Sequence, residues 1–309
     1  MEEQLNSVAY HLGDFRPLRD CNINVMTHAL QYGTMVFGGM RGYYNSSKND
    51  IFLFRPTDHF QRLHRSAHIM QMNLALPIDK MVEIAKQLVI KNNYRCNIYF
   101  RPFVYKSELK LSPRLHDVAD SFSIYTMKLD DYLDTSKGLR VAVASWRRID
   151  DNAIPTRAKV AGGYANSALA KSEVVQNGFD EAIFLDSRGM VSEGSAENIF
   201  IVRDGVLIAP ANSASILEGI TMRSIIELAK SEGIPVERRD IGRTELYIAD
   251  EIFFTGTGAQ VAWVAEVDRR QIANGQIGPI TTRLRDRFLK VIKGQDSEFR
   301  NWAISVYGS

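Results

Sequence analysis

The sequence predicts a mixed α/β protein built from two domains, and three observations carry that prediction. The chain has 309 residues, which is long enough for two domains or one large one. Short apolar strand segments and amphipathic helical segments follow one another along its whole length. Near the middle, residues 130–138 are polar and acidic and lack strand alternation. They predict a linker between an N-terminal α/β domain over 1–129 and a C-terminal domain over 139–309.

The N-terminal domain is expected to contain strands, two amphipathic helices and one glycine-rich stretch. Residues 25–43 hold four glycines and several aromatic residues, which suits a strand where backbone and ligand approach closely. Thr57 is expected to cap a helix that runs to about Leu74, because apolar residues recur there at helical spacing. The other expected elements are strands over 8–12, 51–54, 97–105 and 121–129 and a helix over 80–92.

The C-terminal domain is expected to continue this mixture of strands and helices. A helix over 167–177 is ended by Gly178, and a glycine turn at Gly219 enters a second helix. The remaining expected elements are strands over 139–146, 181–185, 252–259 and 261–267, a strand that ends at 202, and a final helix over 281–293.

Composition and charge exclude several classes of protein. The net charge of +2 gives no support for nucleic-acid binding, which needs a concentrated basic excess. No apolar run approaches the length that spans a bilayer, and the acidic N-terminus has no signal-peptide pattern. Cys21 and Cys96 make no disulfide framework, so a reducing, cytoplasmic setting is expected. His64 and His68 have no third ligand nearby, so no metal site is expected.

One lysine lies in a stretch that suits a nucleophile. Lys159 follows Pro155 and precedes Gly162 and Gly163, so the backbone approach is fixed and the chain can bend just after the lysine. A desolvated lysine loses its proton more easily and attacks carbonyl groups, as in a Schiff base. The alternative is a solvated loop lysine, because lysine side chains are mostly exposed in proteins.

Two stretches suit the binding of an anion. At Gly219–Thr221 a helix begins, where free N–H groups and the positive end of the helix dipole attract negative charge. The alternative there is an ordinary helix capped by threonine. Residues 255–258 alternate threonine and glycine, which builds a nest of backbone donors. These stretches lack the Gly-Lys-Ser/Thr of a Walker loop and the third spaced glycine of a dinucleotide fingerprint.

Two arginines are also placed to bind acidic groups. Arg62 lies near the apolar face of its predicted helix, where it either holds a buried anion or extends its charged head to water. Tyr99 and Arg101 differ by two positions, so on a strand they project from the same face. Such a pair makes either a carboxylate clamp or a surface pair on an edge strand.

Together these features match the needs of pyridoxal 5′-phosphate. This cofactor requires a lysine for its aldehyde, hydrogen-bond donors for its phosphate and an acid that keeps its ring nitrogen protonated. The lysine, the arginine and the two anion-binding stretches supply the first two requirements. Glu193 and Glu197 are both placed to supply the acid, and their spacing alone does not separate them.

Five stretches carry a family resemblance: 154–164 around Lys159, 189–198 around Glu193, 217–221, 246–251 and 255–257. They resemble the class IV (fold type IV) aminotransferases, and in particular the branched-chain amino acid aminotransferases, along nearly the whole chain. The resemblance implies a D-amino acid aminotransferase-like fold with a small N-terminal and a larger C-terminal domain. It also implies pyridoxal 5′-phosphate as the cofactor and a homodimer or higher homo-oligomer.

The resemblance further implies a role for each matching residue. Lys159 is the Schiff-base lysine and the proton carrier, and Glu193 rather than Glu197 is the partner of the pyridine nitrogen. Tyr164 donates to the phenolic oxygen, and Leu217 packs on the cofactor ring. The implied phosphate-binding and other cofactor-binding positions are Arg62, Gly219, Ile220, Thr221, Gly256 and Thr257. The implied substrate-binding positions are Tyr32, Phe37, Gly39, Tyr99, Arg101, Thr257 and Gly258.

The implied reaction is a ping-pong transamination from branched-chain L-amino acids (leucine, isoleucine and valine) to 2-oxoglutarate. Gly38 stands where the family usually has glutamate, and Gly258 where it usually has alanine, so we expect side activity on (R)-primary amines. The alternatives on the same fold are a D-amino acid or (R)-amine transaminase and an aminodeoxychorismate lyase. A non-catalytic phosphate-binding relative is the alternative from a different class.

Overall fold

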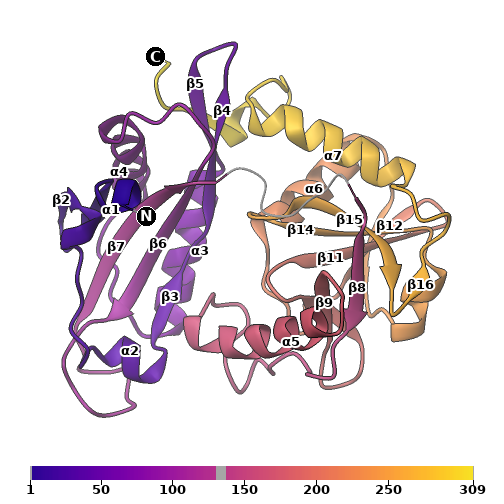
Figure 1. The fold of residues 1–309 in the computed structure, drawn as a ribbon, viewed down its shortest axis with the longest axis horizontal. Coiled ribbons are helices and arrows are strands. Elements are labelled where there is room, and N and C mark those ends of the chain that lie inside the picture. The colour runs from indigo at the N-terminus through magenta and orange to yellow at the C-terminus, as the bar shows by residue number, and fades with distance from the viewer. Residues whose placement is uncertain (1, 130–136, 309) are drawn as a thin grey trace. The chain divides into compact units, whose positions relative to one another are not determined.

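The computed structural model describes residues 2–129 and 137–308, which form two compact units (Figure 1). The first unit comprises Met1–Asp130, Ala158–Gly162 and Lys290–Ser309, and the second comprises Asp131–Arg157 and Gly163–Leu289. Residues 130–136 of the predicted linker lie outside the described residues. The domain boundaries at 129 and 139 stay a prediction. The grouping of 158–162 with the first unit has no counterpart in the sequence pattern.

The first unit is built on an antiparallel sheet of eight strands. The strand order is β17-β5-β4-β6-β7-β1-β2, and β3 also pairs with β6. The strands are β1 (Val8–His11), β2 (Asp14–Pro17), β3 (Met35–Phe37), β4 (Met40–Asn45), β5 (Asp50–Phe54), β6 (Ile98–Lys106), β7 (Asp120–Lys128) and β17 (Ala303–Ser305). The helices are α1 (Glu2–Leu5), α2 (His28–Tyr32), α3 (Pro56–Ile69) and α4 (Ile78–Lys91), with short 3-10 turns at Leu18–Asp20 and Arg300–Trp302.

Strand β6 lies inside this sheet and has the alternation that its sequence predicts. Ile98, Phe100 and Val104 are buried, while Tyr99 and Arg101 between them are half-buried and share one face. The strand pairs with β3 and β4 on one side and with β7 on the other. It is therefore an interior strand, and the alternative of an edge-strand surface pair does not apply to these two residues.

Two details of the N-terminal elements differ from expectation. Residues 25–43 form helix α2 followed by strands β3 and β4 rather than one strand, because Gly33 turns the chain at a φ of 66°. Helix α3 begins at Pro56 after Arg55, so Thr57 is not its cap. Proline fits the first helical position because its missing N–H would be unpaired there in any case.

The second unit is built on a mixed sheet of nine strands. The order is β10-β9-β8-β15-β14-β11-β12-β13, with β16 paired to β15, and the pairs β8/β9, β8/β15 and β12/β13 are parallel. The strands are β8 (Leu139–Val143), β9 (Glu181–Leu185), β10 (Val191–Gly194), β11 (Asn198–Arg203), β12 (Val206–Pro210), β13 (Val236–Arg239), β14 (Glu251–Gly256), β15 (Gln260–Val267) and β16 (Arg270–Gln271). The helices are α5 (Tyr164–Gln176), α6 (Ile220–Ser231) and α7 (Pro279–Ile292), with 3-10 turns at Ala161–Gly163 and Arg243–Ile248.

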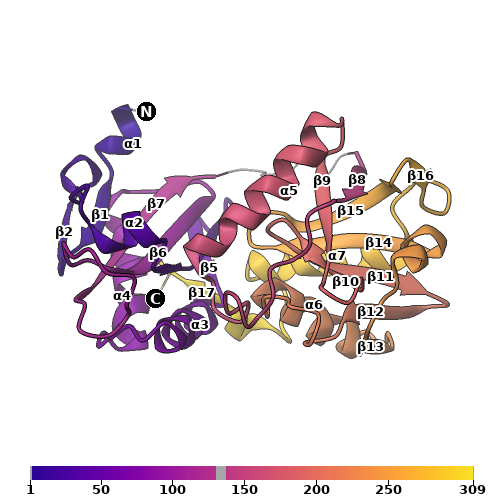
Figure 2. The ribbon, with the colours of Figure 1, turned by 90° about the horizontal axis from the view of Figure 1, so that it is seen from below.

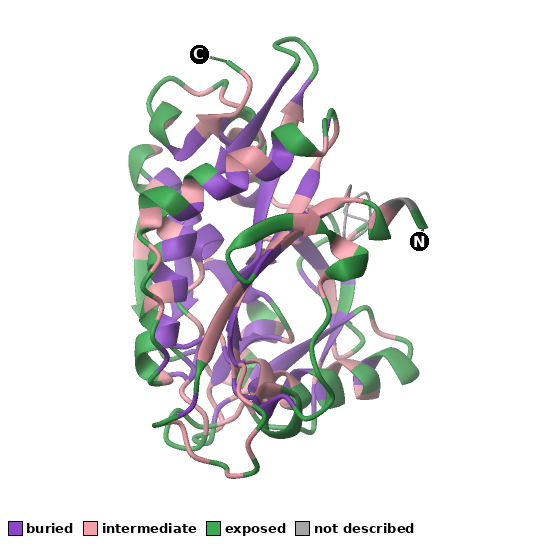
Figure 3. Ribbon diagram, turned by 90° about the vertical axis from the view of Figure 1, so that its left-hand side faces the viewer, coloured by how far each residue is buried: buried purple, intermediate pink, exposed green. Residues whose placement is uncertain are grey.

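Helices of the second unit pack on its sheet. Helix α5 packs on β9, as Figure 2 shows, and α6 packs on β13 and β14. In the sheet, Phe200 and Phe253 stack with ring centroids 5.1 Å apart. Figure 3 shows burial concentrated in the strands and exposed residues on the outer turns of the helices. Among residues 2–129 and 137–308, no helix is both long and apolar enough to cross a bilayer.

Candidate active site

In the first unit, the backbone of Lys159 runs beside strand β3. The Phe37 N–H donates to the Lys159 carbonyl at 3.0 Å, the Lys159 N–H donates to Ser66 Oγ at 3.2 Å, and Val160 bridges Val36. Gly33 passes so close to this segment that a side chain there would put its Cβ 2.8 Å from the Gly162 Cα. The predicted lysine stretch is therefore held beside β3 by backbone hydrogen bonds and one isolated bridge, at a point of close backbone approach.

The Lys159 side chain faces an aromatic ring that also contacts a second cation. Its Nζ lies 5.1 Å from the ring centroid of buried Phe37, and the Arg101 guanidinium lies 4.6 Å from the same centroid. The lysine is half-buried. Partial desolvation of a lysine amine favours its uncharged, nucleophilic form.

The Arg101 guanidinium lies over two aromatic rings, and within 2–129 and 137–308 it pairs with no carboxylate. Its guanidinium is 4.6 Å from the Phe37 centroid and 5.2 Å from that of Tyr99. Its Nε is buried without a hydrogen-bond partner, and no carboxylate of the described residues forms an ion pair with it. At Gly39 an added Cβ would collide with Tyr99 Oη, so the tyrosine ring would have to move to admit a side chain there. This arrangement leaves a cation able to receive an acidic ligand.

The other two predicted residues of the first unit differ in their surroundings. Arg62 on α3 is buried and lies one turn before Ser66, so the two share the helix face that contacts the lysine segment. Its burial argues against the alternative in which the arginine head extends to water. Tyr32 at the end of α2 is exposed and packs on the ring of His28, with centroids 4.8 Å apart. The contact that fixes Tyr32 therefore comes from its own helix.

In the second unit, the buried carboxylate of Glu193 on β10 is held by three donors. Arg148 Nη2 lies 2.9 Å from Oε1, while Asn198 Nδ2 and the Leu217 N–H each donate to Oε2 at 3.0 Å. Donors that contact a carboxylate favour its ionised form. Glu197 is also buried, but its carboxylate accepts from the neighbouring Ala196 N–H.

Asn198 joins Glu193 to both predicted anion-binding stretches. Its Nδ2 also donates to the Leu217 carbonyl at 2.8 Å, and an added Cβ at Gly219 would collide with Asn198 Oδ1. On the other side, Asn198 pairs in register with Thr255, next to the turn between β14 and β15. The glycine at 219 is therefore required by close packing on Asn198.

The two anion-binding stretches have the backbone geometry that their sequences indicate. Helix α6 begins at Ile220 with Gly219 as its N-cap, so the alternative of a Thr221 cap is wrong. Ile220 and Thr221 are buried in its first turn. In the second stretch, Gly256 ends β14, Thr257 and Gly258 form the turn, and an added Cβ at Gly256 would lie 3.3 Å from Glu197 Cγ.

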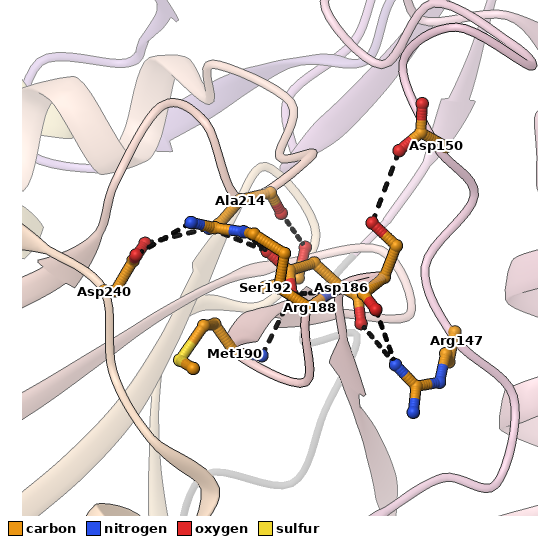
Figure 4. A network of polar contacts seen from close by, with 9 residues as sticks. Arg147, Asp150, Asp186, Arg188, Met190, Ser192, Ala214 and Asp240 are labelled. Carbon is orange, nitrogen blue, oxygen red and sulfur yellow. Dashed lines mark hydrogen bonds and ion pairs between the residues drawn. The ribbon is translucent and has the colours of Figure 1, made fainter.

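A polar network fixes the turn that leads into β10 (Figure 4). The buried Asp186 carboxylate accepts from the Arg188 guanidinium and from the backbone N–H groups of Arg188 and Met190. Arg188 also binds both carboxylate oxygens of Asp240, at 2.8 and 2.9 Å. Hydrogen bonds from Arg188 to Asp240 and Asp186 raise the pKa of its guanidinium. This network holds the strand that carries Glu193.

Two residues that contact Glu193, Arg148 and Asn198, were not predicted as site residues from the sequence. Asn198 stands in the Glu193 motif, and its position at the start of a strand after a tight turn is a signal for a structural amide. Arg148 lies 45 positions before Glu193 in an irregular loop, and no local pattern indicates its partner.

Tyr164 is the first residue of α5 and is half-buried. In the described part of the chain, no group of three or more potential ligands could hold a metal ion.

A family model described as amino-transferase class IV matches residues 35–267 of the chain. A protein of Aquifex aeolicus named "Probable branched-chain-amino-acid aminotransferase" is 44% identical over 300 residues, covering 97% of this chain and 96% of the relative.

Solved structures of similar proteins superpose closely on this chain. A branched-chain aminotransferase from Thermoproteus uzoniensis, solved with norvaline, has a TM-score of 0.94 and 36% identity, covering 97% of this chain and 99% of its own. The branched-chain amino acid aminotransferase from Thermobaculum terrenum, solved in its PLP-form, has a TM-score of 0.94 and 34% identity, covering 99% of this chain and 100% of its own. The similarity therefore spans both units.

Proposed function

Because the chain belongs to the class IV aminotransferases, we propose that it is a pyridoxal 5′-phosphate-dependent branched-chain amino acid transaminase. It transfers the amino group of L-leucine, L-isoleucine or L-valine to 2-oxoglutarate in a ping-pong sequence. The observation that carries the proposal is the 44% identity over 300 residues to a relative bearing that name. The described residues support the proposal with side chains whose chemistry suits pyridoxal 5′-phosphate.

The residues present fit pyridoxal 5′-phosphate by the chemistry of their groups. They offer an amine at Lys159, a buried carboxylate with fixed donors at Glu193, a buried guanidinium at Arg62 and backbone N–H groups at the start of α6. When bound, the cofactor supplies an electron sink for the bonds at the amino acid's Cα. We assign the phosphate and the rest of the cofactor to Arg62, Gly219, Ile220, Thr221, Gly256 and Thr257.

The chain's own residues then have distinct tasks. With the cofactor bound, Lys159 would hold its aldehyde carbon through Nζ, and the free Lys159 amine would move a proton between the amino acid's Cα and that carbon. Glu193 holds the proton on the ring nitrogen, because its ionised carboxylate is an acceptor only. We assign Tyr164 to the phenolic oxygen and Leu217 to packing on the ring.

Arg101 supports 2-oxoglutarate as the acceptor. Its guanidinium lies between the rings of Phe37 and Tyr99 without a carboxylate partner among the described residues, and guanidinium binds carboxylate in a forked geometry. A substrate with a second carboxylate would supply the missing anion. We assign the remaining pocket positions to Tyr32, Gly39, Thr257 and Gly258.

Side activity on (R)-primary amines receives less support than the main reaction. At Gly38 an added Cβ would lie 2.9 Å from Pro102 Cγ, so the proline ring already fills the space beside this glycine. The proposed wider donor range then rests on Gly258 alone. The D-amino acid transaminase and aminodeoxychorismate lyase alternatives gain nothing from the relatives reported above, which carry the branched-chain name.

We further propose that the enzyme assembles as a homodimer or a higher homo-oligomer. Large apolar side chains are exposed on the first unit, among them Val25 at 75% and Leu111 at 73%. Their two segments are joined, because His28 donates its backbone N–H to the Glu108 carbonyl and contacts the Ser112 carbonyl through Nε2. An exposed apolar patch of this kind suits contact with a second copy.

A cytoplasmic setting is consistent with only two cysteines.

A donor screen tests the proposal. The protein loaded with pyridoxal 5′-phosphate is mixed with L-leucine, L-valine, D-alanine, aminodeoxychorismate or (R)-1-phenylethylamine, and its visible absorbance is followed. L-leucine and L-valine should abolish the visible absorbance band of bound pyridoxal 5′-phosphate, and 2-oxoglutarate should restore that band. Conversion by D-alanine alone would establish the D-amino acid alternative, and turnover of aminodeoxychorismate the lyase. A colourless protein after loading would favour a non-catalytic relative.

A further inference from the structure

Arg148 forms an ion pair with Glu193, the carboxylate assigned to the ring nitrogen of the cofactor. Arg148 Nη2 lies 2.9 Å from Glu193 Oε1, and both side chains are largely buried, at 12% and 7% exposure. A charge pair shielded from water in this way is much stronger than the same pair on the surface.

The backbone of Arg148 is hydrogen-bonded to the sheet of the second unit. Its N–H donates to the Leu185 carbonyl at 2.8 Å, at the end of β9. The preceding Arg147 reaches the carbonyls of Asp186 and Ser187 through Nη1, at 3.3 and 2.8 Å (Figure 4). The loop is thus tied to the turn that leads into β10 and to Glu193.

The same loop is fixed on its other side to helix α5. Asn166 accepts from the Ile149 N–H at 3.0 Å through Oδ1, and its Nδ2 donates to the Arg147 carbonyl at 3.0 Å. Asn166 lies two residues after Tyr164, the residue assigned to the phenolic oxygen. The loop is therefore hydrogen-bonded both to the turn before β10, which carries Glu193, and to α5, which carries Tyr164. Both elements fix its geometry.

The polar contact of the Arg148 guanidinium is the ion pair with Glu193. The guanidinium lies 5.7 Å from the centroid of the Phe184 ring, and its Nε is buried without a hydrogen-bond partner. Leaving a buried donor unpaired is unfavourable, so this orientation is retained because the contact with the carboxylate outweighs that loss. The side chain is placed for Glu193 rather than for general packing.

We propose that Arg148 is a positioning residue that keeps Glu193 ionised and aimed at the ring nitrogen of pyridoxal 5′-phosphate. The proposal rests on the proposed function. A ring nitrogen and a carboxylate that share one proton compete for it. Arg148 contacts the carboxylate directly and so lowers the proton affinity of Glu193 more than that of the ring. The proton then resides on the ring, where it is needed for the electron sink.

The test compares Arg148→Met with Arg140→Met, which removes a surface arginine of the same unit paired at 3.6 Å with Glu266. The cofactor dissociation constant is measured on the cofactor-free protein by fluorescence, and the visible band of the loaded protein is titrated with pH. We expect Arg148→Met to weaken cofactor binding roughly tenfold or more. The midpoint of the band should move to higher pH, because the nitrogen that joins Lys159 to the cofactor becomes more basic. Arg140→Met should change neither quantity.

A double-mutant cycle separates positioning from a structural role. If Arg148 acts through Glu193, then Arg148→Met combined with Glu193→Gln should bind cofactor no more weakly than Glu193→Gln alone. Arg148→Lys keeps the charge and should restore most of the midpoint, and it serves as the test if the methionine variant fails to fold. Additive losses in the cycle, a wild-type midpoint in Arg148→Met, or a midpoint in Arg148→Lys as far from wild type as that expected for the methionine variant would overturn the inference. A wild-type protein that takes up no cofactor would instead overturn the proposed function.

Discussion

In the first unit the Arg101 guanidinium lies between two aromatic rings with no carboxylate partner among the described residues. In the second unit the Glu193 carboxylate is held by an arginine, an asparagine and a backbone N–H. A charged side chain without an internal partner can pair with a charged ligand. Its electrostatic attraction then contributes to ligand binding. A charge with fixed internal partners is already oriented before a ligand arrives, so it is suited to an electrostatic role during the reaction.

This difference predicts a division of labour. Changes at Glu193 and its partners should alter cofactor affinity and the reaction itself. Changes at Arg101 should alter the response to acidic substrates and leave the cofactor in place.

Replacing Glu193 by glutamine should have the largest effect of these. The amide no longer holds the ring proton, so the half-reaction with L-leucine should slow by about 10²- to 10³-fold. The change also leaves Arg148 buried opposite a neutral group, which should destabilise the cofactor-free protein by roughly 3 kcal/mol. Rapid-mixing absorbance and urea unfolding measure the two effects. A variant with wild-type rate would show that Glu193 does not contact the ring nitrogen.

Replacing Arg101 by methionine should separate the two half-reactions. The concentration of 2-oxoglutarate needed for half-maximal rate should rise by about 10- to 100-fold, since a hydrogen bond to a charged group contributes roughly 1.5–3 kcal/mol. The cofactor dissociation constant should stay unchanged, and the L-leucine half-reaction should change by less than about threefold. An equal loss in both half-reactions would mean that Arg101 binds the carboxylate common to all substrates.

Replacing Gly219 by alanine tests the packing that joins Glu193 to the start of α6. The new Cβ would collide with Asn198 Oδ1, so the turn or the asparagine must move. We expect a loss of about 1–3 kcal/mol in unfolding free energy, with weaker cofactor binding. Gly242→Ala is the matched control, because a Cβ there meets no atom within 4 Å. Equal behaviour of the two variants in thermal unfolding would contradict the packing described.

A smaller effect concerns acid stability in the first unit. Burial opposes ionisation of Asp50, but hydrogen bonds from Ser305 and from the N–H groups of Tyr307, Ile51 and Gly308 outweigh it and lower the pKa of this carboxyl. A lowered folded-state pKa gives stability that is complete above the ordinary value, about pH 4, and is lost as the pH falls further. Asp50→Asn should therefore lose about 1–2 kcal/mol at pH 7, with a smaller difference from wild type near pH 2. Urea unfolding of both proteins at the two pH values measures this difference.

The elements that the sequence predicts well are those with a strong local period. Tyr99 and Arg101 share a face because β6 alternates, and α6 begins at the predicted glycine turn. The prediction for 25–43 is wrong because its glycines mark a helix end at Gly33 and a close approach at Gly39, which composition alone cannot distinguish from strand bends.

The partner of Glu193 illustrates what local patterns cannot supply. Arg148 lies in an irregular loop, and its contact is set by hydrogen bonds to β9 and α5. Such a contact depends on how distant segments meet, so it becomes visible only when the sheet is assembled. The lysine stretch gives a second example, since its pairing beside β3 follows from tertiary contacts.

The most direct test of the account is a single-turnover experiment on the loaded protein without an acceptor. L-leucine should abolish the visible band of bound pyridoxal 5′-phosphate with formation of one equivalent of oxo acid, and 2-oxoglutarate should then restore the band. Lys159→Ala should do neither. A wild-type band that ignores L-leucine, or an alanine variant that turns over as the wild type does, would contradict the account.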